Sequence, residues 1–181
     1  MKFSEIHELV ACIFASLYSE GKPMKKLELS LQLWQIHKDE LDETRKKLVA
    51  AAQEAAKRAY APYSTFHVGA AVLLANGEII SASNQENAAY PSGLCAERVA
   101  LFFAGSQYPG VAVEKLVIVV ISDLKTPNTI FAPCGACRQV ISETQNRQDI
   151  PMEILFEGPD DYFTLADSIQ QIMPFTFRLN K

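Results

Sequence analysis

Three cysteines, a glutamate and an arginine in two short segments are the residues best suited to chemistry in this chain. Cys95, Glu97 and Arg98 lie in "SGLCAERVALF", and Cys134 and Cys137 form a C-x-x-C pair in "PCGAC". Each segment leads into a run that predicts a helix, so both cysteine groups lie where a loop enters a helix. Three thiolates leave one position of a tetrahedral zinc ion open for water, as in catalytic zinc sites. We therefore predict that Cys95, Cys134 and Cys137 bind Zn²⁺.

Other readings of the cysteines stay open at this point. A closed structural zinc site would need a fourth side chain, which Cys12 or a histidine would supply in principle. The histidines are His7, His37 and His67. Cys12 lies in an apolar run and is better explained as a packing thiol. A redox role for the C-x-x-C pair would leave Cys95 and Glu97 unexplained.

Glu97 and Arg98 fall in the first turn of the predicted helix, next to Cys95. Zinc lowers the pKa of water, and a nearby carboxylate can accept the released proton. We predict that Glu97 is this proton shuttle, although an acidic residue in a first helical turn also stabilises the helix. Three thiolates give the zinc site a net negative charge, which a guanidinium donating to sulfur would offset. We predict this role for Arg98, the alternative being a solvated helix residue.

Composition and charge restrict the class of protein. The chain has 181 residues, a formal net charge of -4 and 49% hydrophobic residues. It has no cluster of Lys and Arg, so the sequence argues against a nucleic-acid backbone as partner. No apolar run reaches the roughly 18 residues of a membrane-spanning helix. Closely spaced cysteines without a convincing signal peptide indicate a reducing, cytoplasmic location.

The order of predicted elements indicates one mixed sheet covered by helices. Asn76-Gly77 lies between two strand-like runs and predicts a hairpin turn. The expected strands are 66–74, 78–83, 115–121 and 152–156, and residues 27–36 are expected to form a half-buried strand or an extended arm. The expected helices are 9–18, 42–60, 96–104, 136–145 and a short one at 165–171.

Four motifs in this order resemble the cytidine deaminase family, small zinc enzymes of pyrimidine salvage. They are "YSTFHVGAAVL", "NQENAAY", "CAERVA" and "PCGACRQV". The homotetrameric type is the closer match, because its three zinc ligands are all cysteines. The resemblance implies a three-layer α/β/α fold with a mixed sheet of about five strands. It also implies hydrolytic deamination of free cytidine and 2′-deoxycytidine, with no nucleic-acid partner.

The resemblance also implies which residues bind the substrate. Asn84 and Glu86 match residues that hold the ribose, chiefly its 3′-hydroxyl group, and the backbone of Ala96 would contact the base. Phe66 would pack against the base, and Tyr90 would close the pocket. Independently of the resemblance, asparagine and glutamate on one loop offer the donor and acceptor groups that can bind a pair of neighbouring hydroxyl groups.

The remaining predictions concern the C-terminal and N-terminal parts of the chain. Phe177 is expected to reach the site of a neighbouring subunit, with Phe175 the less suitable candidate. Residues 43–181 are expected to form the catalytic domain, and residues 1–42 an N-terminal extension made of a helix plus a strand or arm. A break at Gly21-Lys22-Pro23 precedes Met24. This raises the hypothesis that translation starts at Met24 rather than Met1.

Two further functions remain as alternatives. The same chemistry would serve a modified cytosine nucleoside, such as an aminoacyl-nucleoside antibiotic. A non-catalytic zinc-stabilised binding module would need a closed site and would not need Glu97. The sequence leaves the preference between ribose and deoxyribose open.

Overall fold

The computed structural model describes residues 25–123 and 128–179. The chain divides into the units Met1–Ser30 and Leu31–Lys181, and the architecture below is that of the second unit. Its strands are β1 (Trp34–His37), β2 (His67–Leu74), β3 (Ile79–Ser83), β4 (Val113–Ile121), β5 (Glu153–Glu157) and β6 (Tyr162–Ala166). Its helices are α2 (Glu43–Ala56), α3 (Ala96–Gln107) and α4 (Gly135–Asn146), with 3₁₀ turns η1 (Lys38–Glu40), η2 (Tyr90–Ser92) and η3 (Ile169–Gln171).

The six strands form one mixed sheet in the order β1-β6-β5-β4-β2-β3. Only the β4–β5 pair is parallel among these strands, and α4 lies between its two members in the chain. The β2–β3 hairpin predicted from Asn76-Gly77 is confirmed, with Gly77 in the left-handed conformation at φ 88°. The mixed sheet is therefore as predicted, with one strand more than the five expected.

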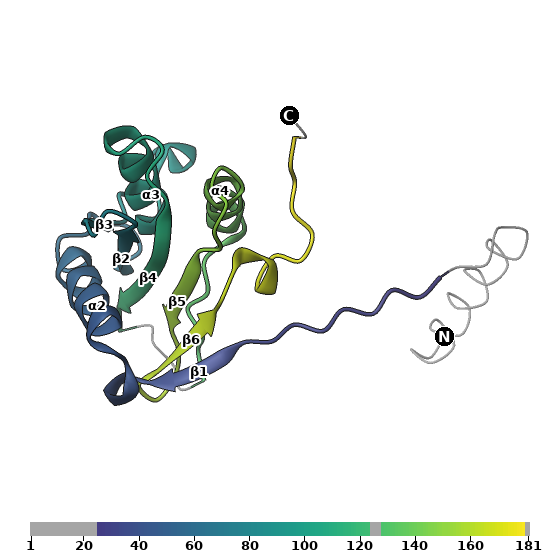
Figure 1. The fold of residues 1–181 in the computed structure, drawn as a ribbon. Helices are drawn as coiled ribbons and strands as arrows, with labels where there is room; N and C mark the ends of the chain where they lie inside the picture. Colours follow the sequence, from purple (N-terminus) through teal and green to yellow (C-terminus); the bar gives the residue numbers. More distant parts are fainter. Residues whose placement is uncertain (1–24, 124–127, 180–181) are drawn as a thin grey trace, which may run out of the picture. The chain divides into compact units, whose positions relative to one another are not determined.

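Helices cover both faces of this sheet (Figure 1). Alternate residues of β2 and β4 point to opposite faces because side chains alternate along a strand. Ala70 and Ile118 belong to the apolar core that includes α3, α4 and η3. Ala71 and Val117 belong to the core that includes α2. The predicted three-layer α/β/α architecture is confirmed.

The helix α2 lies very close to β2 at one point. A Cβ atom placed on Gly69 would lie 1.8 Å from the Ala52 carbonyl oxygen, so only glycine fits there. The first turn of α2 is held by Asp42, whose Oδ1 accepts from the Arg45 N–H at 2.7 Å. The Arg45 guanidinium also binds the Glu153 carboxylate of β5, at 2.9 and 2.6 Å. These contacts fix α2 against the sheet.

Two predicted elements are wrong in part. Of the half-buried strand or extended arm expected at 27–36, only the end is a strand, β1 (Trp34–His37), which pairs with β6. Leu27 and Leu33 are exposed, and an alternating leucine pattern forms no strand where no neighbouring strand pairs with it. The helix expected at 165–171 is instead the end of β6 followed by η3. The pairing of β6 with β5 and β1 outweighs any local helical preference. The helix expected at 9–18 lies outside the described residues.

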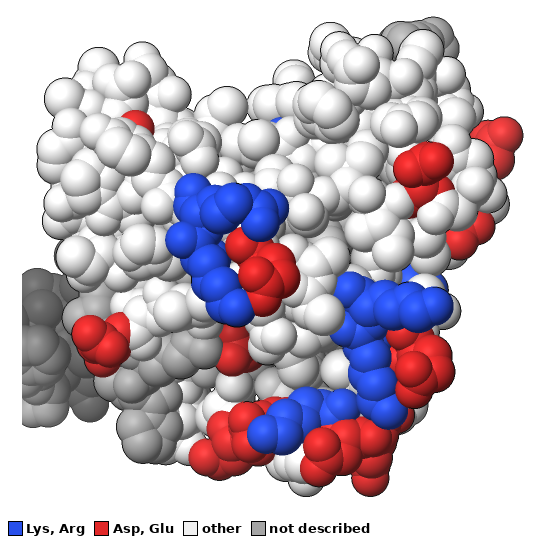
Figure 2. All heavy atoms as spheres, turned by 90° about the vertical axis from the view of Figure 1, so that its left-hand side faces the viewer, with Lys and Arg blue, Asp and Glu red and all other residues white. Residues whose placement is uncertain are grey.

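Charged side chains of both signs lie side by side on the face shown in Figure 2. On α2, Lys46 pairs with Glu43 and Lys57 with Glu54. This face therefore has no extended basic surface that would track a nucleic-acid backbone. Within the described part of the chain, no helix has both the length and the apolar character needed to cross a membrane.

Candidate active site

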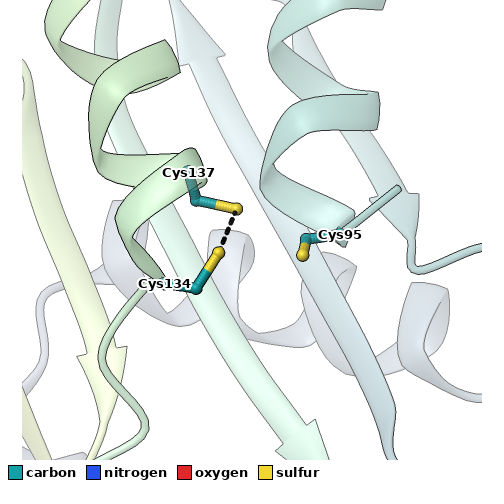
Figure 3. A group of neighbouring side chains, drawn as sticks. All are labelled: Cys95, Cys134 and Cys137. Carbon is teal, nitrogen blue, oxygen red and sulfur yellow. Dashed lines mark hydrogen bonds between the residues drawn. The ribbon is translucent and has the colours of Figure 1, made fainter. Parts of the chain in front are cut away.

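The three predicted zinc ligands come from the starts of two helices (Figure 3). Cys95 is the residue before α3 and Cys134 the residue before α4, and both have extended backbones. Cys137 lies in the first turn of α4 and is buried. Helix N-termini carry partial positive charge, which favours thiolates there. The C-x-x-C spacing thus places two sulfurs on one helical turn, facing the third.

The three sulfur atoms all lie within 4.8 Å of one another. The Cys134 and Cys137 Sγ atoms are 3.5 Å apart and share a hydrogen bond. A hydrogen bond from Cys137, aided by the Arg98 guanidinium, lowers the pKa of the Cys95 thiol to about 5. Donating that bond, together with burial, raises the pKa of the Cys137 thiol. A divalent cation would let all three sulfurs ionise together, so this cluster fits a metal ion.

The donor set fits zinc in particular. Sulfur ligands in a tetrahedral arrangement are typical of zinc sites. Among the described residues, the group holds three side chains that can bind a metal and no fourth. His37 and His67, which lie in the described part, are not members of it. Cys12 and His7 lie outside the described residues. The described ligand set is therefore that of an open site.

Glu97 is a buried carboxylate beside this cluster. The residue is 4% exposed and its Oε2 atom has no hydrogen-bond partner. Burial raises the pKa of this carboxyl. A buried acceptor without a partner is costly and is explained where a ligand or water supplies the missing bond. Glu97 is also one of the residues that line the cavity next to the cysteines.

Arg98 lies where the sequence analysis expected it. Its Nη2 atom is 3.7 Å from the Cys95 Sγ and donates to the Gly93 carbonyl oxygen at 3.2 Å. The backbone contact orients the guanidinium toward the sulfur. This geometry agrees with a role in offsetting thiolate charge, which stays a prediction.

A cavity of about 610 Å³ opens beside the cysteines. Its volume is in the range of small-molecule sites. Phe66 and Phe131 lie on its wall with ring centroids 5.9 Å apart and planes tilted by 47°. Sequence reasoning found Phe66 and missed Phe131, because a single aromatic in a loop carries no periodic signal. Two rings at this spacing form an apolar wall suited to a planar base.

Asn84 and Glu86 lie on the same cavity. The buried Asn84 amide donates to the Phe66 carbonyl oxygen at 2.9 Å and accepts from the Val68 N–H at 2.8 Å. These bonds tie the end of β3 to β2, and the amide keeps one N–H and one lone pair for another partner. Glu86 accepts from the Tyr63 N–H at 2.8 Å. Hydrogen bonding from Ser64, with that from the Tyr63 backbone, lowers the pKa of the Glu86 carboxyl.

The remaining predicted residues divide into two groups. Tyr90 lines the cavity, is 78% exposed and makes an edge-on contact with Tyr63 at 6.4 Å. Ala96 is fully buried, and as the first residue of α3 it has an N–H without a partner inside the helix. Phe177 and Phe175 are exposed and do not line this cavity. The structure thus brings together every predicted site residue except Phe177, whose role stays a prediction.

Comparisons with known proteins show the family to which the chain is related. The family model "Cytidine and deoxycytidylate deaminase zinc-binding region" matches residues 42–152. A cytidine deaminase from Halalkalibacterium halodurans is 46% identical over 99 residues, covering 55% of this chain and 70% of the relative. A probable cytidine deaminase from Dictyostelium discoideum is 44% identical over 131 residues, covering 72% of this chain and 82% of the relative.

Solved structures give the same result for the fold. The crystal structure of cytidine deaminase from Burkholderia pseudomallei has a TM-score of 0.61 and 35% identity. The match covers 73% of this chain and 98% of that one. Cytidine deaminase from Mycobacterium tuberculosis has a TM-score of 0.59 and 31% identity, covering 76% of this chain and 100% of that one.

Fold and site together define a zinc-binding deaminase with an open three-thiol centre. The chain belongs to the cytidine and deoxycytidylate deaminase family. The resemblance stated from the four sequence motifs is thereby confirmed.

Proposed function

We propose that this protein is a cytidine deaminase that converts free cytidine and 2′-deoxycytidine to the uridines with release of ammonia. The observation that carries the proposal is the buried Glu97 carboxylate beside three clustered thiols, facing a cavity of about 610 Å³. The names of the relatives support the same substrate class.

Cys95, Cys134 and Cys137 would hold the zinc ion, which supplies a Lewis acid that activates water when bound. Glu97 accepts a proton from water and delivers it to N3 of the pyrimidine. The oxygen of water bonds to C4. Glu97 then transfers the remaining proton of that oxygen to the amino group, and the C4–N4 bond breaks to release ammonia and leave a carbonyl at C4. Burial raises the pKa of this carboxyl, which helps Glu97 to hold the proton between the two transfers.

The other residues of the site bind and orient the nucleoside. Phe66 and Phe131 pack against the base, and the Ala96 N–H contacts it. Asn84 and Glu86 bind the ribose through the bonding positions that their contacts leave free. Tyr90 covers the mouth of the pocket, and Arg98 offsets the charge of the thiolates.

We further propose a cytoplasmic homotetramer whose catalytic domain spans residues 43–181. Free thiols at Cys95, Cys134 and Cys137 support a reducing compartment. Exposed aromatic side chains on α3 and near the C-terminus support burial in an assembly, with Phe177 entering a neighbouring site. Light scattering on the purified protein should give four times the mass of the chain, and a monomer would refute this part. β1 adds an edge strand from the N-terminal extension, residues 1–42.

The test of function is the loss of ultraviolet absorbance of cytidine on mixing with the protein, with 2′-deoxycytidine measured in parallel. We expect both to be deaminated, and a cytosine within a single-stranded oligonucleotide to react far more slowly. Deamination of an aminoacyl-nucleoside antibiotic with no turnover of cytidine would favour the modified-nucleoside alternative. Bound zinc with no turnover of any of these would favour a non-catalytic zinc module.

A further inference from the structure

We propose that Ser64 is a positioning residue for substrate binding, joining the Glu86 carboxylate to the backbone of Phe66. The inference rests on the proposed function, because it assigns Ser64 a part in holding the nucleoside. Ser64 lies in the loop between α2 and β2, whereas Glu86 lies in the loop after β3. The hydroxyl group therefore connects two segments that each contribute one wall of the cavity.

The hydroxyl of Ser64 makes one bond as donor and one as acceptor. It donates to Glu86 Oε1 and accepts from the Phe66 N–H at 3.0 Å. The Ser64 and Tyr63 N–H groups reach the other carboxylate oxygen, Oε2, at 3.4 and 2.8 Å. The carboxylate thus binds the backbone N–H groups of two consecutive residues, Tyr63 and Ser64, and the Ser64 hydroxyl links it to a third backbone N–H, that of Phe66.

The backbone of this loop requires such support. Thr65 has a φ of 54°, a left-handed conformation that a β-branched residue adopts only under constraint. Its N–H donates to the Ala61 carbonyl oxygen at 3.0 Å, which closes the turn. Ser64 precedes Thr65, and its hydroxyl accepts from the N–H of Phe66, which follows Thr65, so this bond spans the turn. The same hydroxyl donates to the Glu86 carboxylate.

Holding Glu86 in this way matters for affinity. A carboxylate has roughly four acceptor positions, and the loop occupies Oε1 once and Oε2 twice. Oε1 therefore retains one position for a hydroxyl group of the ligand. A side chain that is already ordered loses less rotamer freedom on binding, so the affinity for the sugar rises. Ser64, Phe66 and Glu86 all line the cavity.

The test compares Ser64→Ala with Ser64→Thr on cytidine and on 3′-deoxycytidine. Loss of one hydrogen bond to a charged group should raise KM for cytidine about three- to tenfold, with a much smaller change in kcat. The KM for 3′-deoxycytidine should change less, because this substrate lacks the hydroxyl group assigned to Glu86. Ser64→Thr keeps the hydroxyl group and should restore the KM for cytidine. Ser106→Ala, at an exposed serine of α3 remote from the cavity, is the matched control.

Two results would overturn the inference. One is an unchanged KM for cytidine in Ser64→Ala, and the other is an equal rise in KM for both substrates. If the wild-type protein does not deaminate cytidine, the proposed function fails, and crystal structures then decide about Ser64. We expect the Glu86 carboxylate in Ser64→Ala to leave the Tyr63 N–H and the Thr65 turn to relax. A carboxylate that keeps its wild-type position in that variant would refute the positioning role.

Discussion

The Cys134 and Cys137 sulfur atoms lie 3.5 Å apart, one helical turn from each other at the start of α4. With Cys95 they form a group within 4.8 Å, so removing any one thiol removes a third of the ligand set. We expect Cys95→Ala, Cys134→Ala and Cys137→Ala each to lower the zinc content from about one per chain to a small fraction of that. Zinc is measured by atomic emission on purified protein. Cys12→Ser is the matched control and should keep its zinc, whereas zinc loss in that variant would indicate a fourth ligand.

Arg98 is expected to tune the centre rather than to bind the metal. Its guanidinium lies 3.7 Å from the Cys95 Sγ, so its loss leaves thiolate charge uncompensated. Arg98→Gln should lower kcat about 10- to 100-fold, the usual range for a partner of a metal ligand. Arg98→Lys keeps the charge but loses the planar fork, and should be intermediate. Steady-state kinetics at saturating zinc checks this, and wild-type kcat in Arg98→Gln would contradict it.

Gly69 is expected to be the glycine of the sheet least tolerant of a side chain. A Cβ atom there would lie 1.8 Å from the Ala52 carbonyl oxygen, so α2 and β2 would have to separate. Gly69→Ala should cost about 3 kcal/mol or more in free energy of unfolding, at the upper end for overpacking. Gly105→Ala is the control, because a Cβ atom at Gly105 would lie 3.9 Å from the end of the flexible Arg147 side chain. Urea denaturation compares the two, and equal stability would contradict the predicted close approach.

Asp42 gives a pH dependence of stability with a definite sign. Hydrogen bonding from the Arg45 backbone lowers the pKa of this carboxyl below its usual 3.8. The ionised group therefore stabilises the folded protein above pH 3.8, and this contribution is lost as the pH falls through the folded-state pKa.

Asp42→Ala removes the N-cap of α2 and should cost about 1 kcal/mol at pH 7. The difference from wild type should shrink once the pH falls below about 4. Asp42→Asn keeps a capping oxygen and should lose less at pH 7. Thermal unfolding of all three proteins across this range checks the prediction, and a difference that grows on acidification would contradict it.

Local patterns predicted most of the sheet and both cysteine-bearing helices. The apolar run of β4 and the hairpin at Asn76-Gly77 are strong signals, and both elements formed as expected. β6 was missed although it forms a hairpin with the neighbouring β5, because its other partner, β1, lies far away in the chain. The alternating leucines from Leu27 predicted a strand longer than β1, because alternation reports an extended chain and not a pairing partner.

The part of the site that could be predicted consists of residues that lie close together in the sequence. Cys95, Glu97 and Arg98 lie at the start of one helix and the C-x-x-C pair at the start of another, so their positions in the fold could be predicted from spacing. Phe131 and Ser64 could not be found in this way. Each acts through a residue distant in sequence, Phe131 opposite Phe66 and Ser64 bonded to Glu86. Only the folded chain brings these pairs together.

The role of Glu97 is the central claim, and one substitution tests it most directly. Glu97→Gln keeps the shape of a buried side chain but can no longer accept and release a proton. Turnover of cytidine and zinc content should be measured on the same sample. We predict a fall in kcat of about 10²–10⁴-fold or more, with about one zinc still bound per chain. A Glu97→Gln protein that retains both its zinc and wild-type turnover would contradict the proton-transfer role of Glu97.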